Sequence, residues 1–210
     1  MSTGMIDFNK FKQMIEAQVE RGLNPHDAFK AKPIDLELFK AVRQGDFSAV
    51  YDKVTNGADL QAFNSSGNTL LHEAVSAREY DIALLLLSEG ADVNALTKKG
   101  TPVVSLAAMF ADERLMELLI EEGAELNQVD ASSSTALHYA VRMSKPEVVG
   151  KLLESGAKTD FKDSNGLTAF ELAMDMKNHD IMDVFMAKEE KEHLETAISK
   201  EVKTKPRVRV

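Results

Sequence analysis

Five histidines are the side chains in this sequence best suited to acid–base or metal chemistry. His72 and His138 lie in two copies of a Thr-x-x-His string, and His26, His179 and His193 are scattered along the chain. A zinc site on a helix commonly uses a His-x-x-x-His pair, which the sequence lacks. We therefore expect a structural role for His72 and His138, and we predict no metal site.

Acidic residues form a second group at helical spacing, here called the acidic ridge: Asp112-Glu113, Glu117 and Glu121-Glu122. A solvated helix face explains such a ridge, and cation binding or general acid catalysis is the alternative. The chain has no cysteine, which excludes disulfides, a thiol nucleophile and zinc held by thiolates. We find no nucleophile with a plausible base, no phosphate-binding loop and no dinucleotide fingerprint. We therefore predict no catalytic residues, no cofactor and no enzyme.

Composition and charge indicate a soluble protein that does not bind nucleic acid. The 210 residues are 44% hydrophobic and 28% charged, which is typical of one or two globular domains. The net charge is −9, and residues 34–187 hold 13 basic and 25 acidic side chains, which repel phosphates. The longest apolar run, 82–87, is too short to span a membrane. The first residues lack the apolar core of a secretory signal, so we expect a cytoplasmic protein, with secretion by a non-classical bacterial route as the alternative.

A period of 33 residues runs through most of the chain. Gly-Ala recurs at Gly57-Ala58, Gly90-Ala91, Gly123-Ala124 and Gly156-Ala157. The same step separates Ala41, Ala74, Ala107, Ala140 and Ala173, and also Thr69, Pro102, Thr135 and Thr168. Several columns that share one period are the signature of a repeat architecture.

Each unit predicts two short helices and a turn-rich connection. Thr69, Thr135 and Thr168 stand where a hydroxyl caps the N-terminus of a helix. A small alanine at the centre of this first helix lets neighbouring helices stack closely. A second, apolar helix ends at the glycine, which suits a left-handed cap. One unit cannot bury its own apolar face, whereas a stack of units can.

This pattern resembles the ankyrin repeat, a unit of 33 residues with a T-P-L-H-x-A string. The strings TLLHEA at 69–74, TALHYA at 135–140 and TAFELA at 168–173 carry the resemblance. It implies an all-α solenoid of about five units, which we number repeats 1 to 5: residues 34–63, 64–96, 97–129, 130–162 and 163–187. Repeats 1 and 5 resemble N- and C-terminal capping units. Pro102, Ser105 and Ser133 depart from the pattern and leave the local hairpin shape open.

Two flanks extend beyond the repeats. Residues 1–33 carry apolar side chains at helical spacing, namely Phe8, Phe11, Ile15 and Val19. We expect helices that pack on repeat 1, and a separate partner-binding helix is the alternative. Residues 188–210 predict a polar helix to residue 199, followed from Lys200 by a basic, mobile tail. This Glu-rich stretch before a basic C-terminus is similar to the translocation signals of some bacterial type IV effectors.

The ankyrin resemblance implies that a partner docks on the concave face, which the hairpin tips and first helices form. The positions on that face change from unit to unit, and from repeat 3 onward they are strongly apolar, as suits a protein-binding surface. Arg142 is expected to anchor a carboxylate of the partner. Inter-repeat packing is the alternative role for some of these residues. The predicted contacts are Leu106, Met109, Phe110, Tyr139, Arg142, Met143, Leu172, Met176, Lys98 and Lys99.

The predicted function is non-catalytic binding of another protein by a chain that is a monomer before its partner arrives. Within that class the chain acts as an adaptor or as an inhibitor of a partner enzyme. The alternatives are a bacterial effector delivered into a host cell, a stack that self-associates, and an enzyme with a site at the N-terminal flank.

Overall fold

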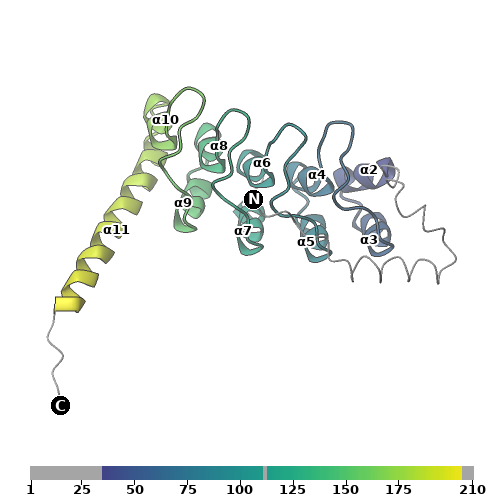
Figure 1. Cartoon of the computed structure of the whole chain (residues 1–210), viewed down its shortest axis with the longest axis horizontal. Coiled ribbons are helices and arrows are strands. Elements are labelled where there is room, and N and C mark those ends of the chain that lie inside the picture. Colours follow the sequence, from purple (N-terminus) through teal and green to yellow (C-terminus); the bar gives the residue numbers. More distant parts are fainter. Residues whose placement is uncertain (1–34, 111–112, 205–210) are drawn as a thin grey trace, which may run out of the picture. The chain divides into compact units, whose positions relative to one another are not determined.

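A computed structural model describes residues 35–110 and 113–204. The predicted N-terminal flank and residues 205–210 lie outside the described residues. The helices, labelled in Figure 1, are α2 (Leu36–Gln44), α3 (Phe47–Thr55), α4 (Leu70–Ala77), α5 (Tyr80–Ser88), α6 (Val103–Phe110), α7 (Glu113–Glu121), α8 (Ala136–Arg142), α9 (Pro146–Glu154), α10 (Ala169–Asp175) and α11 (His179–Thr204).

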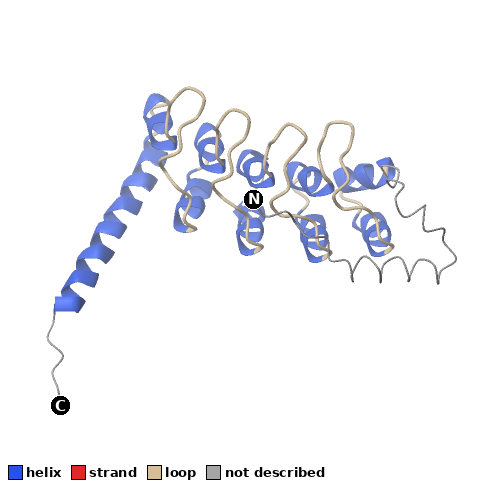
Figure 2. Ribbon diagram, in the orientation of Figure 1, coloured by secondary structure: helices blue, strands red, loops and turns tan. Residues whose placement is uncertain are grey.

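The described helices lie in two rows (Figure 2). The inner helices α2, α4, α6, α8 and α10 each pack on the next, and the outer helices α3, α5, α7, α9 and α11 do the same. The two helices of one repeat also pack on each other. This order confirms the predicted all-α solenoid, in which each repeat contacts only its neighbours.

The core lies between the two rows and between neighbouring repeats. The central alanines of α4, α6, α8 and α10 are fully buried: Ala74, Ala107, Ala140 and Ala173. Because each presents only a methyl group, the inner helices approach one another closely. Branched and long apolar side chains of the outer helices fill the remaining volume, including Ile82, Leu86, Leu115, Leu119, Val149 and Leu152.

The hairpins that lead into the inner helices keep one geometry. In each, a backbone N–H donates to the carbonyl four residues later, as in Thr97 to Thr101 at 2.9 Å and Asp130 to Ser134 at 3.1 Å. Ser133 adopts a φ of 57°, in the position where the other hairpins have a glycine. The hairpins with Pro102 and Ser133 therefore keep this hydrogen bond, and the hairpin of repeat 3 adds an antiparallel bridge between Leu96 and Pro102.

Glycines follow the outer helices in left-handed conformations, as predicted. Their φ values are 82°, 91°, 83° and 88° at Gly57, Gly90, Gly123 and Gly156. Glu189 stands next in this column, and α11 runs through it to Thr204. Residues 200–204, which the sequence had assigned to the mobile tail, are therefore helical. Among the described residues, no helix combines the length and the apolar character needed to cross a membrane.

Candidate functional site

The two histidines of the Thr-x-x-His strings join neighbouring repeats. Thr69 Oγ1 lies 2.7 Å from His72 Nδ1, and His72 Nε2 lies 3.2 Å from the carbonyl of Thr101 in repeat 3. His138 repeats this arrangement, with its Nε2 3.1 Å from the carbonyl of Leu167. A carbonyl only accepts hydrogen bonds, so Nε2 is the protonated nitrogen of each ring.

Burial fixes the charge state of these rings. Both histidines are almost completely buried, and burial lowers the pKa of each, against the raising effect of the carbonyl that accepts from Nε2. Neutral imidazoles that cap one helix and tie down the next hairpin are structural groups, as expected.

The same column is filled differently in repeats 3 and 5. Glu171 Oε2 accepts from the backbone N–H of Thr168 at 2.8 Å, which completes a capping box and lowers the pKa of Glu171. Ser105 is fully buried, and its Oγ has no hydrogen-bond partner among the described residues. Pro102 explains this gap, because it supplies neither a hydroxyl nor an N–H where the other repeats have threonine.

Arg142 and Tyr139 are held by hydrogen bonds within the chain. Arg142 Nη2 lies 2.6 Å from Asp163 Oδ2, and Arg142 Nη1 donates to Ser134 Oγ at 3.0 Å. The Arg142 guanidinium lies 5.5 Å from the centre of the Tyr139 ring, and the Tyr139 hydroxyl donates to Asp130. This cluster connects the inner helix α8 to two successive hairpins.

Hydrogen bonds keep the two carboxyl groups of the cluster ionised. Burial alone would raise the pKa of Asp130, but hydrogen bonds from Tyr139 and Ser132 hold it below its usual value. Burial opposes ionisation of Asp163 as well, and backbone N–H bonds together with the charge of Arg142 lower its pKa. Sequence reasoning missed both aspartates, although they stand 33 residues apart in the column that begins each hairpin.

Arg142 therefore differs from its predicted role. It already pairs with a fully buried carboxylate of its own chain. Pulling it away to bind a partner would leave that carboxylate buried without its cation, at a cost of about 1–3 kcal/mol. These contacts favour a role for Arg142 in holding the face in shape over the expected role as polar anchor.

Three of the predicted apolar contacts form a ladder on the inner helices. Phe110, Met143 and Met176 stand at the C-terminal ends of α6, α8 and α10, each 33 residues from the next. Their side chains are 40%, 43% and 40% exposed. We call these three residues the apolar ladder.

The other predicted contacts divide by burial. Leu106, Met109 and Tyr139 are half-buried beside the ladder. Leu172 is only 8% exposed and packs in the core, which argues against a role as a partner contact. Lys98 and Lys99 are exposed at the hairpin tip of repeat 3, where the Lys98 ammonium lies 5.5 Å from the centre of the Phe63 ring.

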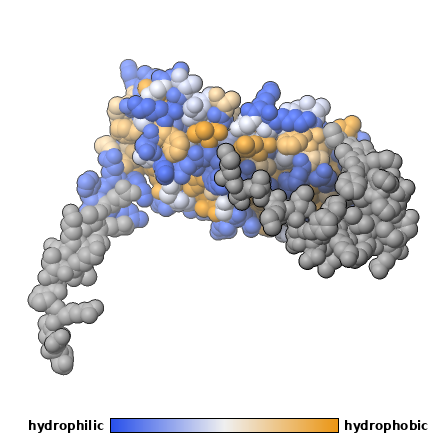
Figure 3. Space-filling model, viewed as in Figure 1, coloured by the Kyte–Doolittle hydropathy of each residue, from blue (hydrophilic) through white to orange (hydrophobic). Residues whose placement is uncertain are grey.

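Hydrophobic surface outside the ladder lies on the outer helices. Phe47 and Tyr51 of α3 stack with ring centres 6.2 Å apart, and Phe47 lies near the exposed Leu84 of α5. A shallow cavity of about 370 Å³ lies between these helices, lined by Phe47, Asp81, Leu84, Leu85 and Ser88. In the view of Figure 3, hydrophobic and hydrophilic surface alternate across the repeats, without one dominant patch.

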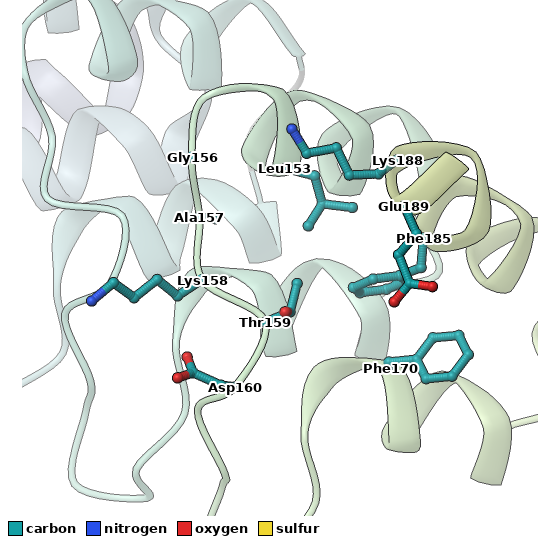
Figure 4. Close-up of a pocket in the computed structure, with 10 residues that line it drawn as sticks. All are labelled: Leu153, Gly156, Ala157, Lys158, Thr159, Asp160, Phe170, Phe185, Lys188 and Glu189. Atoms are coloured by element: carbon teal, nitrogen blue, oxygen red, sulfur yellow. The ribbon is translucent and has the colours of Figure 1, made fainter. Parts of the chain in front are cut away.

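A larger groove of about 730 Å³ lies where the stack ends. Figure 4 shows the loop at Gly156–Asp160 facing α11, with Leu153 and Phe185 between them. In earlier repeats the side chain equivalent to Asp160 holds the next loop: Asn94 Oδ1 accepts from the N–H of Glu125 at 2.7 Å. The residue that Asp160 would hold in the same way is residue 191, which lies within the continuous helix α11 and not in a loop. We interpret the groove as the open end of the solenoid.

The acidic ridge occupies an outer helix. Glu117 of α7 pairs with Lys151 of α9 at 2.5 Å, and Glu113 and Glu121 are exposed. Asp112 lies outside the described residues. Across residues 35–110 and 113–204, no group of three His, Asp or Glu side chains is arranged to hold a metal ion.

Comparison with known families agrees with this architecture. A model described as ankyrin repeats (3 copies) matches residues 104–196, and a model of the single ankyrin repeat matches residues 66–98. Together the two matches cover more than half of the chain. A search of curated proteins finds no match.

Proposed function

The chain belongs to the ankyrin-repeat family, and we propose that it binds another protein on the face formed by its hairpin tips and inner helices in repeats 3 to 5. Ankyrin repeats generally form non-catalytic protein–protein interaction modules. The observation that carries the proposed location is the apolar ladder.

Packing does not require the ladder. The same column holds Gln44 in repeat 1 and Ala77 in repeat 2, and the chain forms inner helices there as well. A single exposed hydrophobic side chain is ordinary on a protein surface, whereas a row of them on neighbouring helices favours an interaction site. Methionine also adapts its shape to a partner, which suits a binding surface.

Within this class, we propose that the chain acts as an adaptor or as an inhibitor of a partner enzyme. The acidic repeats disfavour nucleic acid as the partner. We propose that the chain is a monomer until the partner binds. The Glu-rich stretch and basic C-terminus support delivery into a host cell as the second candidate.

Site-specific photo-crosslinking tests the location. Benzoylphenylalanine replaces Phe110 or Met143 in the intact chain, and the matched controls place it at Leu84 or Glu117 on the outer helices. We expect cross-links to one protein from the ladder positions alone. Cross-links from the outer positions alone would refute the proposal.

Alanine substitution provides the energetic test. Phe110→Ala or Met143→Ala should weaken binding of the cross-linked partner by about 2 kcal/mol if the residue lies at the centre of the interface. Glu117→Ala and Glu121→Ala should alter the salt dependence of binding more than its strength. Ladder variants that bind like the parent chain would show that the partner lies elsewhere.

A further inference from the structure

On the basis of the function proposed above, we propose that the apolar ladder receives an amphipathic α-helix of the partner, laid along the stack, with an apolar residue at every seventh position.

The spacing of the ladder matches a seven-residue step of a helix. The inner helices α6, α8 and α10 pack side by side, and packed helix axes are about 8–10 Å apart. Phe110, Met143 and Met176 occupy one register on these helices, so the ladder repeats at about the same distance. Seven residues of an α-helix advance about 10.5 Å and return to almost the same side. Positions i, i+7 and i+14 of one helix therefore meet the three ladder residues in turn.

A β-strand partner does not fit this spacing. Side chains on one face of a β-strand recur every two residues, at about 6.7 Å and then about 13 Å. Side chains on one face of a polyproline helix recur every three residues, at about 9.3 Å, which does match the spacing of the ladder. Polyproline segments, however, dock in grooves lined with aromatic side chains.

The composition of the ladder favours the α-helix over polyproline. Only Phe110 is aromatic, the other two residues are methionines, and the chain contains no tryptophan. Flexible methionine side chains mould around the irregular apolar stripe of a helix, as helix-binding grooves rich in methionine do.

Charge on the hairpin tips indicates how the helix is oriented. Exposed Lys98 and Lys99 stand at the tip of repeat 3, and the equivalent positions are Ala131-Ser132 in repeat 4 and Ser164-Asn165 in repeat 5. The C-terminus of a helix carries partial negative charge, and acidic side chains add to it. Lys98 and Lys99 precede α6 and Phe110 ends it, so acidic side chains of the partner helix, rather than its terminus, are placed to reach these lysines. The partner helix should therefore carry its acidic side chains at the end that lies over repeat 3, on the side that faces the hairpin tips.

Three synthetic peptides test the inference on the intact chain. The first is an 18-residue helix former with leucine at positions 2, 9 and 16, leucine or alanine one turn after each, and glutamate in the last turn. The second has the same composition with the leucines scrambled, and the third is proline-rich with leucine at every third position. Fluorescence anisotropy measures binding up to 1 mM, and circular dichroism measures the helicity gained.

We expect the first peptide to bind at least tenfold more tightly than the other two and to gain helicity. Phe110→Ala or Met143→Ala should weaken it at least tenfold, whereas the outer-helix control Leu84→Ala should not. Lys98→Glu combined with Lys99→Glu should also weaken it, and replacing the terminal glutamates by lysine should restore binding to that variant. Unchanged urea midpoints show that these variants remain folded.

The alternative outcomes separate the two proposals. Tighter binding of the proline-rich peptide through the ladder, or no binding of the helical peptide at 1 mM, overturns the helix assignment. Cross-links from ladder positions to a non-helical segment of the partner also overturn the helix assignment, but they support the proposed location of the binding face. Cross-links confined to the outer helices overturn both.

Discussion

An ion pair joins repeats 4 and 5 at the centre of the proposed face. The Asp163 side chain is fully buried, and its charge is supported by the Arg142 guanidinium and by the backbone N–H groups of Asn165 and Leu167. A buried carboxylate is tolerated only when such partners surround it. Arg142 and Asp163, beside the apolar ladder, therefore stabilise the packing of repeat 4 on repeat 5.

Removing the arginine should expose this dependence. Arg142→Ala leaves the Asp163 carboxylate without its cation, and we expect the free energy of unfolding to fall by about 1–3 kcal/mol. Urea unfolding followed by circular dichroism measures the change. Lys151→Ala, which breaks the more exposed pair with Glu117, is the matched control and should barely move the urea midpoint. An Arg142→Ala chain as stable as the parent would contradict the role given to the pair.

The buried histidines make stability depend on pH. Burial lowers the pKa of His72 and His138 in the folded chain below the ordinary value of 6.5. At a pH just below 6.5, the unfolded chain therefore binds more protons than the folded chain. Their full contribution is present above about pH 6.5 and is lost as the pH falls toward the folded pKa. Each histidine contributes a slope of up to about 1.4 kcal/mol per pH unit in that window. Urea midpoints at pH 7.5, 6.5 and 5.5 measure the loss.

A substitution identifies the source of this pH dependence. His138→Gln should flatten the profile, because it removes one titrating group, even though the variant is less stable at pH 7.5. His193→Gln changes an exposed residue of α11 and should leave the profile unaltered. Equal slopes in the parent chain and in His138→Gln would argue against the histidines as the cause.

Helix ends are the elements that set the length of each unit. Where glycine follows an outer helix, its positive φ turns the chain toward the next hairpin, and where Glu189 takes that place the helix continues. A residue with a Cβ resists the left-handed conformation, most strongly when it is β-branched. The glycine at this position therefore favours the end of the outer helix and the start of the next hairpin.

Valine at these glycines should destabilise the stack. A Cβ added at Gly90 or Gly123 meets no atom within 4 Å, so the cost of Gly90→Val or Gly123→Val comes from the backbone alone. We expect at least about 1–2 kcal/mol from urea unfolding. Gly150→Ala is the control, because Gly150 lies within α9 and its added Cβ would be an ordinary 3.7 Å from Val184. That variant should be as stable as the parent or more so, and a reversed order would refute the backbone explanation.

The described solenoid as a whole is held by contacts between neighbours, so its stability varies along the stack. Repeats 2 and 3 are covered on both sides by other repeats. Repeat 5 is covered on one side only, and α11 continues past it into solvent-exposed charged residues. Terminal repeats in such arrays open first.

Native-state hydrogen exchange should reveal this gradient. We expect the slowest exchange across residues 64–129 and the fastest across 163–210, with residues after Glu189 opening before α10. Mass spectrometry of peptic fragments resolves these segments. Uniform protection from residue 64 through residue 199 would be inconsistent with a stack that frays from its C-terminal end.

The repeat architecture follows from the sequence alone. Glycine, alanine and threonine recur at one period because each meets a local structural requirement. Glycine adopts a positive φ, alanine permits close helix packing, and threonine caps a helix. Local demands of this kind are visible without any knowledge of long-range contacts. For that reason the helices, their order and the structural role of His72 and His138 were predictable.

The tertiary structure decided which polar and apolar side chains remain available for binding. Tyr139 and Arg142 lie in variable columns, as Phe110 and Met143 do, yet the first two are held by aspartates from hairpins 9 and 21 residues away. Leu172 is buried although its column partner Leu106 is half-exposed. Exposure and pairing depend on what a neighbouring repeat places opposite each side chain. These contacts between repeats form only in the assembled stack. The period in the sequence shows how the repeats align, but it does not determine which of their side chains come into contact.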